Sequence, residues 1–166
     1  MPMRIRKLIG ALFMVVYVIF YALIAMAHLA HKPGSASARE IAEKYEIPTE
    51  LMAKVLQRLA RRGLLASQQG ARGGYQLAHA AAGISVADVI QAIDGPVSVT
   101  ACSAHGDRCS QFEKCNVRDP LWRISDIILS ALARTSLSEL ASDVAVGGPG
   151  AALRTPVRVV QAAVRA

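Results

Sequence analysis

The sequence is poor in cysteine and in charged residues, and each shortage excludes a class of protein. Three cysteines in 166 residues are too few, and odd in number, for a small domain built on disulfides. Charged residues make up only 19% of the chain and apolar residues 53%, a balance that excludes an intrinsically disordered chain. The length fits one domain with a hydrophobic core, or one small domain with appendages, and excludes a large multidomain enzyme.

Catalytic motifs are also missing. No set of a nucleophile, a base and an orienting side chain is recognisable. The glycine-rich stretch at residues 70–74 is too short to cradle a phosphate, and it lies between two predicted strands. We therefore expect a protein that binds a partner and not an enzyme.

Acidic residues are scarce where basic residues gather. The chain has 12 Asp and Glu against 19 Lys and Arg, a formal net charge of +7 at pH 7. Between Leu51 and Ala87 there is no acidic residue at all. A basic surface of this kind favours a polyanionic partner, either nucleic acid or an acidic membrane surface.

A long apolar run lies near the start of the chain, where residues 8–27 carry no charge and follow three basic residues. Twenty apolar residues can span a bilayer as a helix, and residues 25–27 would fit a signal-peptide cleavage site. Alternatively, residues 20–30 form the first core helix of a domain, and residues 1–19 are an atypical extension from a divergent or misassigned start. We favour this second interpretation, so membrane association is not favoured.

Two short helical patterns joined by a turn predict a helix-turn-helix. Ser35 or Ser37 can cap the first helix, and the second is expected from about residue 48 to residue 62, before Gly63. Its buried stripe is expected at Leu51, Val55, Leu56 and Leu59.

Two short strands are then expected at residues 64–67 and 75–78, around a glycine-rich loop that can adopt positive φ angles. Because this hairpin follows the helix-turn-helix, we expect it to form the wing of a winged-helix domain. Residues 20–96 are therefore predicted to form a winged helix-turn-helix domain.

The basic side chains of the second helix lie on the face opposite its apolar stripe, where they can neutralise phosphates or reach base edges. The N-terminal end of this helix would enter the major groove. Arg72, at the tip of the hairpin, is placed to reach the minor groove or a phosphate. The candidate DNA contacts are Ser37, Thr49, Glu50, Lys54, Arg58, Arg61 and Arg72, with Arg62 on the same helix face.

A further helix is expected at residues 85–93. A long dimerisation helix is expected within residues 119–143, where Asp119 can cap it and its apolar stripe is sustained to Arg134, and Ser136 can cap one last short turn. The long helix is apolar on several sides and is therefore predicted to pair with a second copy in a symmetric homodimer. Residues 144–166 are expected to be a basic, flexible tail. The fold class is mainly α with a small β-hairpin wing, a winged helix-turn-helix plus a long C-terminal dimerisation helix.

The three cysteines lie together in a polar loop predicted at residues 97–118, where Cys102, Cys109 and Cys115 have the spacing C-x6-C-x5-C. Three thiolates this close indicate an iron–sulfur cluster or zinc. Each normally takes four protein ligands, and His105 is the nearest candidate for the fourth. Unliganded or oxidised thiols are the third alternative.

The predicted helix-turn-helix, wing, cysteine loop and long helix resemble, in their order along the chain, the IscR/NsrR-type winged-helix iron–sulfur transcription regulators. Among these they are most similar to the regulators of SUF cluster assembly. The resemblance runs from about Phe20 to Leu140. It is carried by the three-cysteine segment and by YALIAMAHLA (21–30), EIAEKYEIP (40–48), VLQRLARRGLL (55–65), GARGGYQLA (70–78), ISVADVIQAIDGP (84–96) and DPLWRISDIILSALARTSLSEL (119–140).

The resemblance implies a cytoplasmic homodimer that binds a palindromic promoter site on double-stranded DNA and carries an iron–sulfur cluster, 2Fe–2S or sometimes 4Fe–4S, on the three cysteines. Four positions depart from the family pattern. Phe20 replaces an acidic ligand and Arg118 a histidine ligand, so the fourth cluster ligand is unassigned. Gln69 replaces an arginine of the wing, and Ala53-Lys54 replace a Glu-Gln pair in the recognition helix.

We therefore predict a DNA-binding transcriptional regulator, most simply a repressor, whose redox-labile iron–sulfur cluster governs cluster-assembly or stress genes. Two alternatives stay open. One is a winged-helix repressor that is stapled by zinc or holds no metal, and the other is a membrane-anchored protein that uses its basic domain on acidic lipid.

Overall fold

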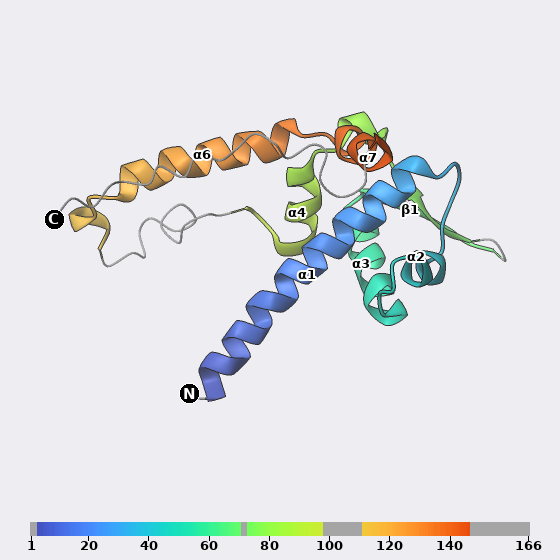
Figure 1. Cartoon of the computed structure of the whole chain (residues 1–166), viewed down its shortest axis with the longest axis horizontal. Helices are drawn as coiled ribbons and strands as arrows, with labels where there is room; N and C mark the ends of the chain where they lie inside the picture. The colour runs from blue at the N-terminus through green and yellow to red at the C-terminus, as the bar shows by residue number, and fades with distance from the viewer. Residues whose placement is uncertain (1–2, 71–72, 98–110, 147–166) are drawn as a thin grey trace.

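The computed structural model describes residues 3–70, 73–97 and 111–146, and these residues are mostly helical with one small antiparallel sheet (Figure 1). The two short elements named η are 3-10 turns. In chain order the elements are α1 (Met3–His31), α2 (Ala38–Lys44), α3 (Thr49–Arg61), β1 (Leu65–Gln68), β2 (Gly74–Leu77), η1 (Ala81–Gly83), α4 (Val86–Asp94), η3 (Phe112–Lys114), α6 (Arg118–Arg134) and α7 (Leu137–Val146).

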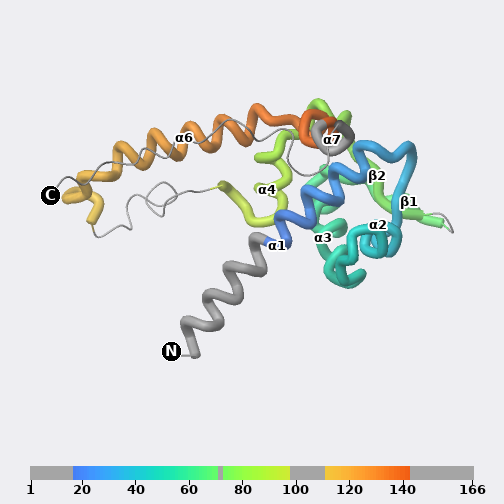
Figure 2. The backbone as a smooth tube through the Cα atoms, viewed as in Figure 1, coloured from blue at the N-terminus to red at the C-terminus, as the bar shows by residue number. Residues whose placement is uncertain are grey.

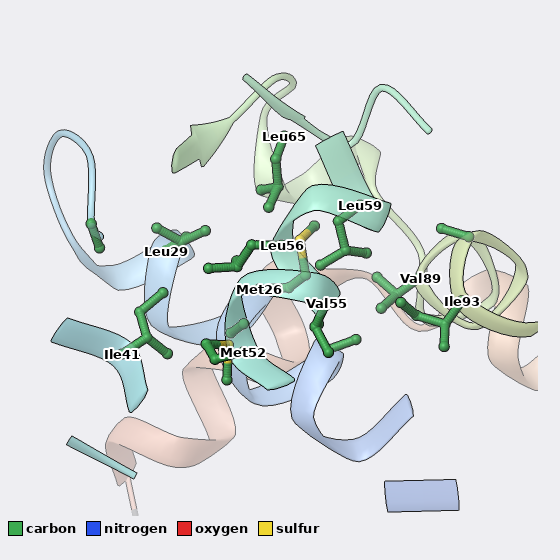
Figure 3. Packing of buried hydrophobic residues seen from close by; sticks show 14 of the residues in the cluster. Met26, Leu29, Ile41, Met52, Val55, Leu56, Leu59, Leu65, Val89 and Ile93 are labelled. Atoms are coloured by element: carbon green, nitrogen blue, oxygen red, sulfur yellow. The ribbon is translucent and has the colours of Figure 1, made fainter. Parts of the chain in front are cut away.

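The core forms around the C-terminal half of α1. Its buried residues Ala22, Ala25, Met26 and Leu29 follow the i, i+3, i+4, i+7 spacing of one helix face. They belong to one cluster with buried residues of α3 and α4 (Figure 3). The second interpretation of the apolar run is therefore confirmed for this half of the helix, which is a core helix.

The arrangement of α1 sets the shape of the molecule. The C-terminal half of the helix packs across α3 and α4 and ends beside α7 (Figures 1 and 2). In the described part of the chain, no helix is both long enough and apolar enough to cross a membrane.

Helices α2 and α3 form the predicted helix-turn-helix, with one correction to the buried stripe of α3. Leu51 was expected in this stripe but is only half-buried, whereas Met52 is fully buried with Val55, Leu56 and Leu59. The stripe therefore begins one residue later. Positions 52, 55, 56 and 59 share one helix face, and position 51 is rotated about 100° around the helix axis from position 52.

The hairpin wing is also present, with strands one residue closer to the tip than predicted. β1 pairs with β2 from Leu65 opposite Leu77 to Gln68 opposite Gly74. The backbone of residue 78 still donates a hydrogen bond to the carbonyl of residue 64, at 3.0 Å. The expected strands at residues 64–67 and 75–78 thus have the right pairing with bounds shifted toward the turn.

In the dimerisation segment predicted at residues 119–143, the long helix ends at Arg134, as its apolar stripe indicated. The structure has two helices there, because the chain breaks at Thr135 and Ser136 to pair with the segment before α4. The amide of Val86 donates to the carbonyl of Thr135 at 2.9 Å, and that of Leu137 to the carbonyl of Ile84 at 2.7 Å. Helix α7 then packs back against α1, with Leu137 in the core.

The long helix begins differently from its prediction, whereas the cap predicted at Ser136 is present and opens a helix longer than the short turn expected there. α6 starts at Arg118 after Val117, and the carboxylate of Asp119 accepts a hydrogen bond from Arg118 Nε at 2.8 Å instead of capping the helix. α7 is capped by Ser136, whose Oγ accepts from the amide of Glu139 at 3.2 Å. It extends to Val146, so the first residues of the predicted tail are helical, and residues 147–166 lie outside the described part of the chain.

Truncation of Met52 tests the corrected stripe. We expect Met52→Ala to lower the free energy of unfolding by about 2–5 kcal/mol, because it leaves a cavity in a fully buried position. Leu51→Ala serves as the matched control and should cost clearly less, since Leu51 is half-exposed. Urea unfolding measures both values, and an equal or larger loss for Leu51→Ala would restore the original stripe.

Candidate nucleic-acid interface

The start of α2 is fixed by Ser37, one of the two predicted caps. Its Oγ accepts a hydrogen bond from the amide of Glu40 at 3.1 Å. Ser37 was also a candidate DNA contact, and the structure gives this hydroxyl a local partner within the helix. Its contact with DNA stays a prediction.

Helix α3 has two chemically opposite faces. Four residues of one face are buried in the core, whereas the basic side chains of the other are exposed. None of these basic side chains forms an ion pair with a described residue. They line a surface depression of about 450 Å³, formed by Lys54, Arg58, Arg61 and Arg62.

The N-terminal end of α3 presents Thr49 and Glu50, which are both exposed. The structure therefore brings these two candidates, together with Lys54, Arg58 and Arg61, onto one exposed helix. Arg72, the candidate at the wing tip, lies outside the described residues.

The wing is attached to the helix-turn-helix by its own backbone. Ala36, just before α2, and Tyr75 of β2 exchange two hydrogen bonds, at 2.9 and 2.8 Å. A Cβ at Gly74 would lie 2.5 Å from the carbonyl oxygen of Ala36, and one at Gly73 would lie 2.5 Å from that of Gln68. These two glycines are needed for close backbone approach, and the positive φ predicted for this loop occurs at Gly70 (φ 125°).

A small polar cluster joins α1 to α2 beneath the helix-turn-helix. The buried ring of His28 packs edge-on against Tyr45, and its Nδ1 lies 3.3 Å from both the Tyr45 hydroxyl and Lys44 Nζ. Burial, followed by the charge of Lys44, lowers the pKa of His28. At neutral pH the ring is therefore uncharged, and Nδ1 can accept a hydrogen bond from its neighbours. The ion pair of Lys32 with Glu40 links the same two segments.

Of the predicted metal ligands, only Cys115 is among the described residues. It follows η3 and precedes α6, is half-buried, and is a free thiol. Cys102, His105 and Cys109 lie outside the described residues. The grouping of the three cysteines with His105 thus stays a prediction.

The structure also shows a cluster that the sequence analysis missed, next to Cys115. The guanidinium carbon of Arg118 lies 4.6 Å from the ring centroid of Phe112 and 5.5 Å from that of Trp122. These three side chains come from η3 and from α6. Arg118 and Trp122 are four residues apart on one helix, but no regular spacing relates them to Phe112, so periodicity alone does not identify the cluster.

Comparison with known proteins decides the family. The family profile described as Rrf2, iron-dependent transcriptional regulator, matches residues 19–143. The chain belongs to the Rrf2 family. The IscR-type resemblance drawn from the sequence motifs is thereby confirmed.

Curated relatives of this Rrf2 protein are transcriptional regulators and not enzymes. The HTH-type transcriptional regulator IscR of Escherichia coli is 33% identical over 126 residues, which cover 74% of this chain and 76% of IscR. The IscR of Cronobacter sakazakii is 34% identical over the same length.

Solved structures confirm the winged-helix fold. CymR, the global cysteine regulator of B. subtilis, superposes with a TM-score of 0.62 and 28% identity, over 76% of this chain and 94% of CymR. The IscR of T. potens gives a TM-score of 0.61 and 25% identity, over 80% of this chain and 90% of that one.

Substitution of Gly74 tests how the wing is held. We expect Gly74→Ala to weaken specific DNA binding at least several-fold, because the added Cβ would collide with the backbone of Ala36 and separate the wing from α2. Gly83→Ala is the control, since a Cβ there meets no atom within 4 Å. Fluorescence anisotropy with an operator fragment measures both, and an unchanged affinity of the Gly74 variant would show that the wing position is irrelevant to binding.

Proposed function

We propose that this Rrf2-family regulator acts in the cytoplasm as a homodimeric repressor that binds a palindromic promoter site and is controlled by an iron–sulfur cluster, most simply 2Fe–2S. Cluster-assembly or stress genes are the proposed targets. The observation that carries the DNA-binding part is the exposed basic face of α3. Its four basic side chains have no acidic partner among the described residues, so their charge is available for phosphates.

The arrangement of α3 supports binding in a DNA groove. Its opposite face is anchored in the core by Met52, Val55, Leu56 and Leu59, so the basic side chains project from a fixed support. A helix held in this way can place its N-terminal residues in the major groove while the wing reaches the flanking backbone.

The outer face of α6 supports the homodimer. Ile124, Ile127 and Ile128 are exposed, with Ile127 at 68% of its full accessible area. Large aliphatic side chains in a row on one helix are costly in water and are typical of a surface that a second copy covers. A two-fold dimer through this helix would also supply the symmetry that a palindromic site requires.

The donor set fits an iron–sulfur cluster in two respects. Cys115 is a half-buried free thiol on the turn before α6, at the end of the three-cysteine segment. The Nε1 of Trp122, in the α6 helix that follows, is buried with no hydrogen-bond acceptor from the described residues, so a sulfur acceptor would satisfy it. Cys102, Cys109 and Cys115 would hold the cluster, with His105 as the proposed fourth ligand. When bound, an iron–sulfur cluster supplies a metal centre that oxidants or iron scarcity can alter.

A continuous path of packed helices connects Cys115 to the DNA-binding face. Cys115 precedes α6, α6 packs on α4, and α4 packs on α3. Regulation of DNA binding by the cluster therefore requires two arrangements of these helices that differ in their affinity for DNA. Protein with the cluster must favour one arrangement and protein without it the other.

Replacement of Arg58 tests the phosphate contacts. We expect Arg58→Ala to weaken DNA binding and to reduce the slope of log affinity against log salt by about 1 for each protomer. Arg39→Ala is the control, because Arg39 on α2 is also exposed but pairs with Glu43 at 2.7 Å. Titrations at several salt concentrations give the slope, and an unaltered slope for Arg58→Ala would remove this residue from the phosphate set.

Sedimentation equilibrium tests the dimer. The protein should sediment at twice the chain mass of 17.6 kDa, and Ile127→Asp should shift it to the mass of one chain by placing a charge in the apolar face. Ala133→Asp adds the same charge on another side of α6 and should leave the dimer intact. A single-chain mass for the unmodified protein would contradict the proposal.

Metal analysis tests the cluster. Anaerobically purified protein should be brown, with nearly equal amounts of iron and acid-labile sulfide, and Cys109→Ala should lose both while staying folded. Ser110→Ala, next to that thiol, is the matched control and should retain them. A colourless protein with stoichiometric zinc, or one without metal after anaerobic reconstitution, would refute control by an iron–sulfur cluster.

A further inference from the structure

The only tryptophan of the chain lies in the first part of α6, the helix that follows Cys115. Trp122 of α6 packs against Phe112 of η3, with ring centroids 6.2 Å apart and planes at 50°. The guanidinium of Arg118 lies over both rings. We refer to Phe112, Arg118 and Trp122 together as the aromatic clamp.

The aromatic clamp closes the turn around Cys115. Arg118 Nη1 donates a hydrogen bond to the carbonyl oxygen of Phe112 at 3.1 Å, and Arg118 Nε donates one to Asp119. Cys115 lies midway between Phe112 and Arg118, three residues from each. Both ends of this short segment are therefore tied together, which restricts where the thiol can lie.

One polar atom of the aromatic clamp has no described partner. Trp122 Nε1 is buried, and no acceptor from the described residues reaches it. The indole nitrogen can only donate a hydrogen bond, and a buried donor without an acceptor is unfavourable and rare in folded proteins. An acceptor is therefore expected at this position in the working protein.

We propose that the indole N–H of Trp122 donates a hydrogen bond to a sulfur atom of the three-cysteine centre, either a cysteine thiolate or a cluster sulfide. This inference rests on the proposed iron–sulfur cluster. Sulfur of this kind carries negative charge and accepts hydrogen bonds from surrounding N–H groups. Trp122 is then a positioning residue that also sets the reduction potential of the centre, because an N–H donor stabilises the reduced, more negative state.

Arg118 contributes in a different way. Its side chain is engaged by two aromatic rings, by the Phe112 carbonyl and by Asp119. A cationic guanidinium so placed stays protonated and cannot act as a ligand. It instead holds Trp122 and the Cys115 turn together, so that the indole keeps its orientation.

Because Trp122 is the only tryptophan, its indole N–H gives a single resonance in the spectrum of the ¹⁵N-labelled full-length protein. We expect this resonance to be broadened or absent in cluster-loaded protein relative to apo protein, since the sulfur atom that accepts the hydrogen bond would itself be bonded to iron. Tryptophan fluorescence should be quenched in parallel. An indole resonance and a fluorescence yield that are identical in the two forms would overturn the proposal.

Trp122→Phe removes the donor and keeps an aromatic ring. We expect this variant still to bind iron and sulfide but to have a more negative reduction potential, with a three- to tenfold lower ratio of reduced to oxidised centre at a fixed potential. Tyr21→Phe, which removes a polar hydrogen from an aromatic ring packed on the core, is the control and should leave the ratio unchanged. An unchanged potential in Trp122→Phe would also overturn the proposal.

The iron content of the unmodified protein distinguishes a failure of the cluster proposal from a failure of the Trp122 proposal alone. Protein that takes up no iron and sulfide refutes both the cluster and the role of Trp122. Protein that takes up both, with an unperturbed indole and an unchanged potential in Trp122→Phe, refutes only the role of Trp122.

Discussion

The packing of α1 against α3 is the contact on which the rest of the molecule depends. Ala22 and Ala25 of α1 are fully buried, and their small side chains allow close approach of the neighbouring helices. Met26 then fills the space between them (Figure 3). Helices α4 and α7 and strand β2 also contact α1, so the orientation of α3 follows from this one helix.

This contact explains how a short helix can offer an exposed face on which basic side chains predominate. The thirteen residues of α3 would be marginal in isolation, because like charges on adjacent turns repel and helices of this length are barely stable in water. Burial of four aliphatic and thioether side chains on the other face offsets the repulsion. The same core that stabilises the fold thus holds Lys54, Arg58, Arg61 and Arg62 on the exposed face, where they form no ion pair with any residue that the structure describes.

Local signals predicted most of the fold. Apolar periodicity located the core helix within α1, the helix-turn-helix and α4, and the glycine-rich loop located the wing. The errors have a common cause, since they arose where tertiary contacts outweigh the local pattern. The apolar stripe indicated an end near Arg134 and a cap at Ser136, but only the hydrogen bonds of Thr135 with Val86 and of Leu137 with Ile84 show that the following helix turns back onto the core.

The candidate site was predictable to a similar degree. Charge spacing sufficed to identify the basic face of α3, because one helix carries all of its members. The Gly73-Gly74 pair was recognised as a turn signal, but its actual role depends on the nearby backbones of Gln68 and Ala36. The aromatic clamp could not be predicted in full, since Arg118 and Trp122 are four residues apart on one helix but Phe112 joins them from a 3-10 turn at no regular spacing.

The break at Thr135 and Ser136 also determines how α6 can move. The C-terminal end of α6 is tied to the segment before α4, and the helix extends from there so that its Cys115 end lies far from the body (Figure 1). Its seventeen residues make a rod of about 25 Å. A rod of that length, fixed at one end, needs to turn by only about 2° to displace its far end by 1 Å. Conversely, a displacement of 1 Å at the Cys115 end rotates the anchored end of α6 by only about 2°. The stiffness of α6 and its packing on α4 therefore govern how much of this rotation is transmitted to α3.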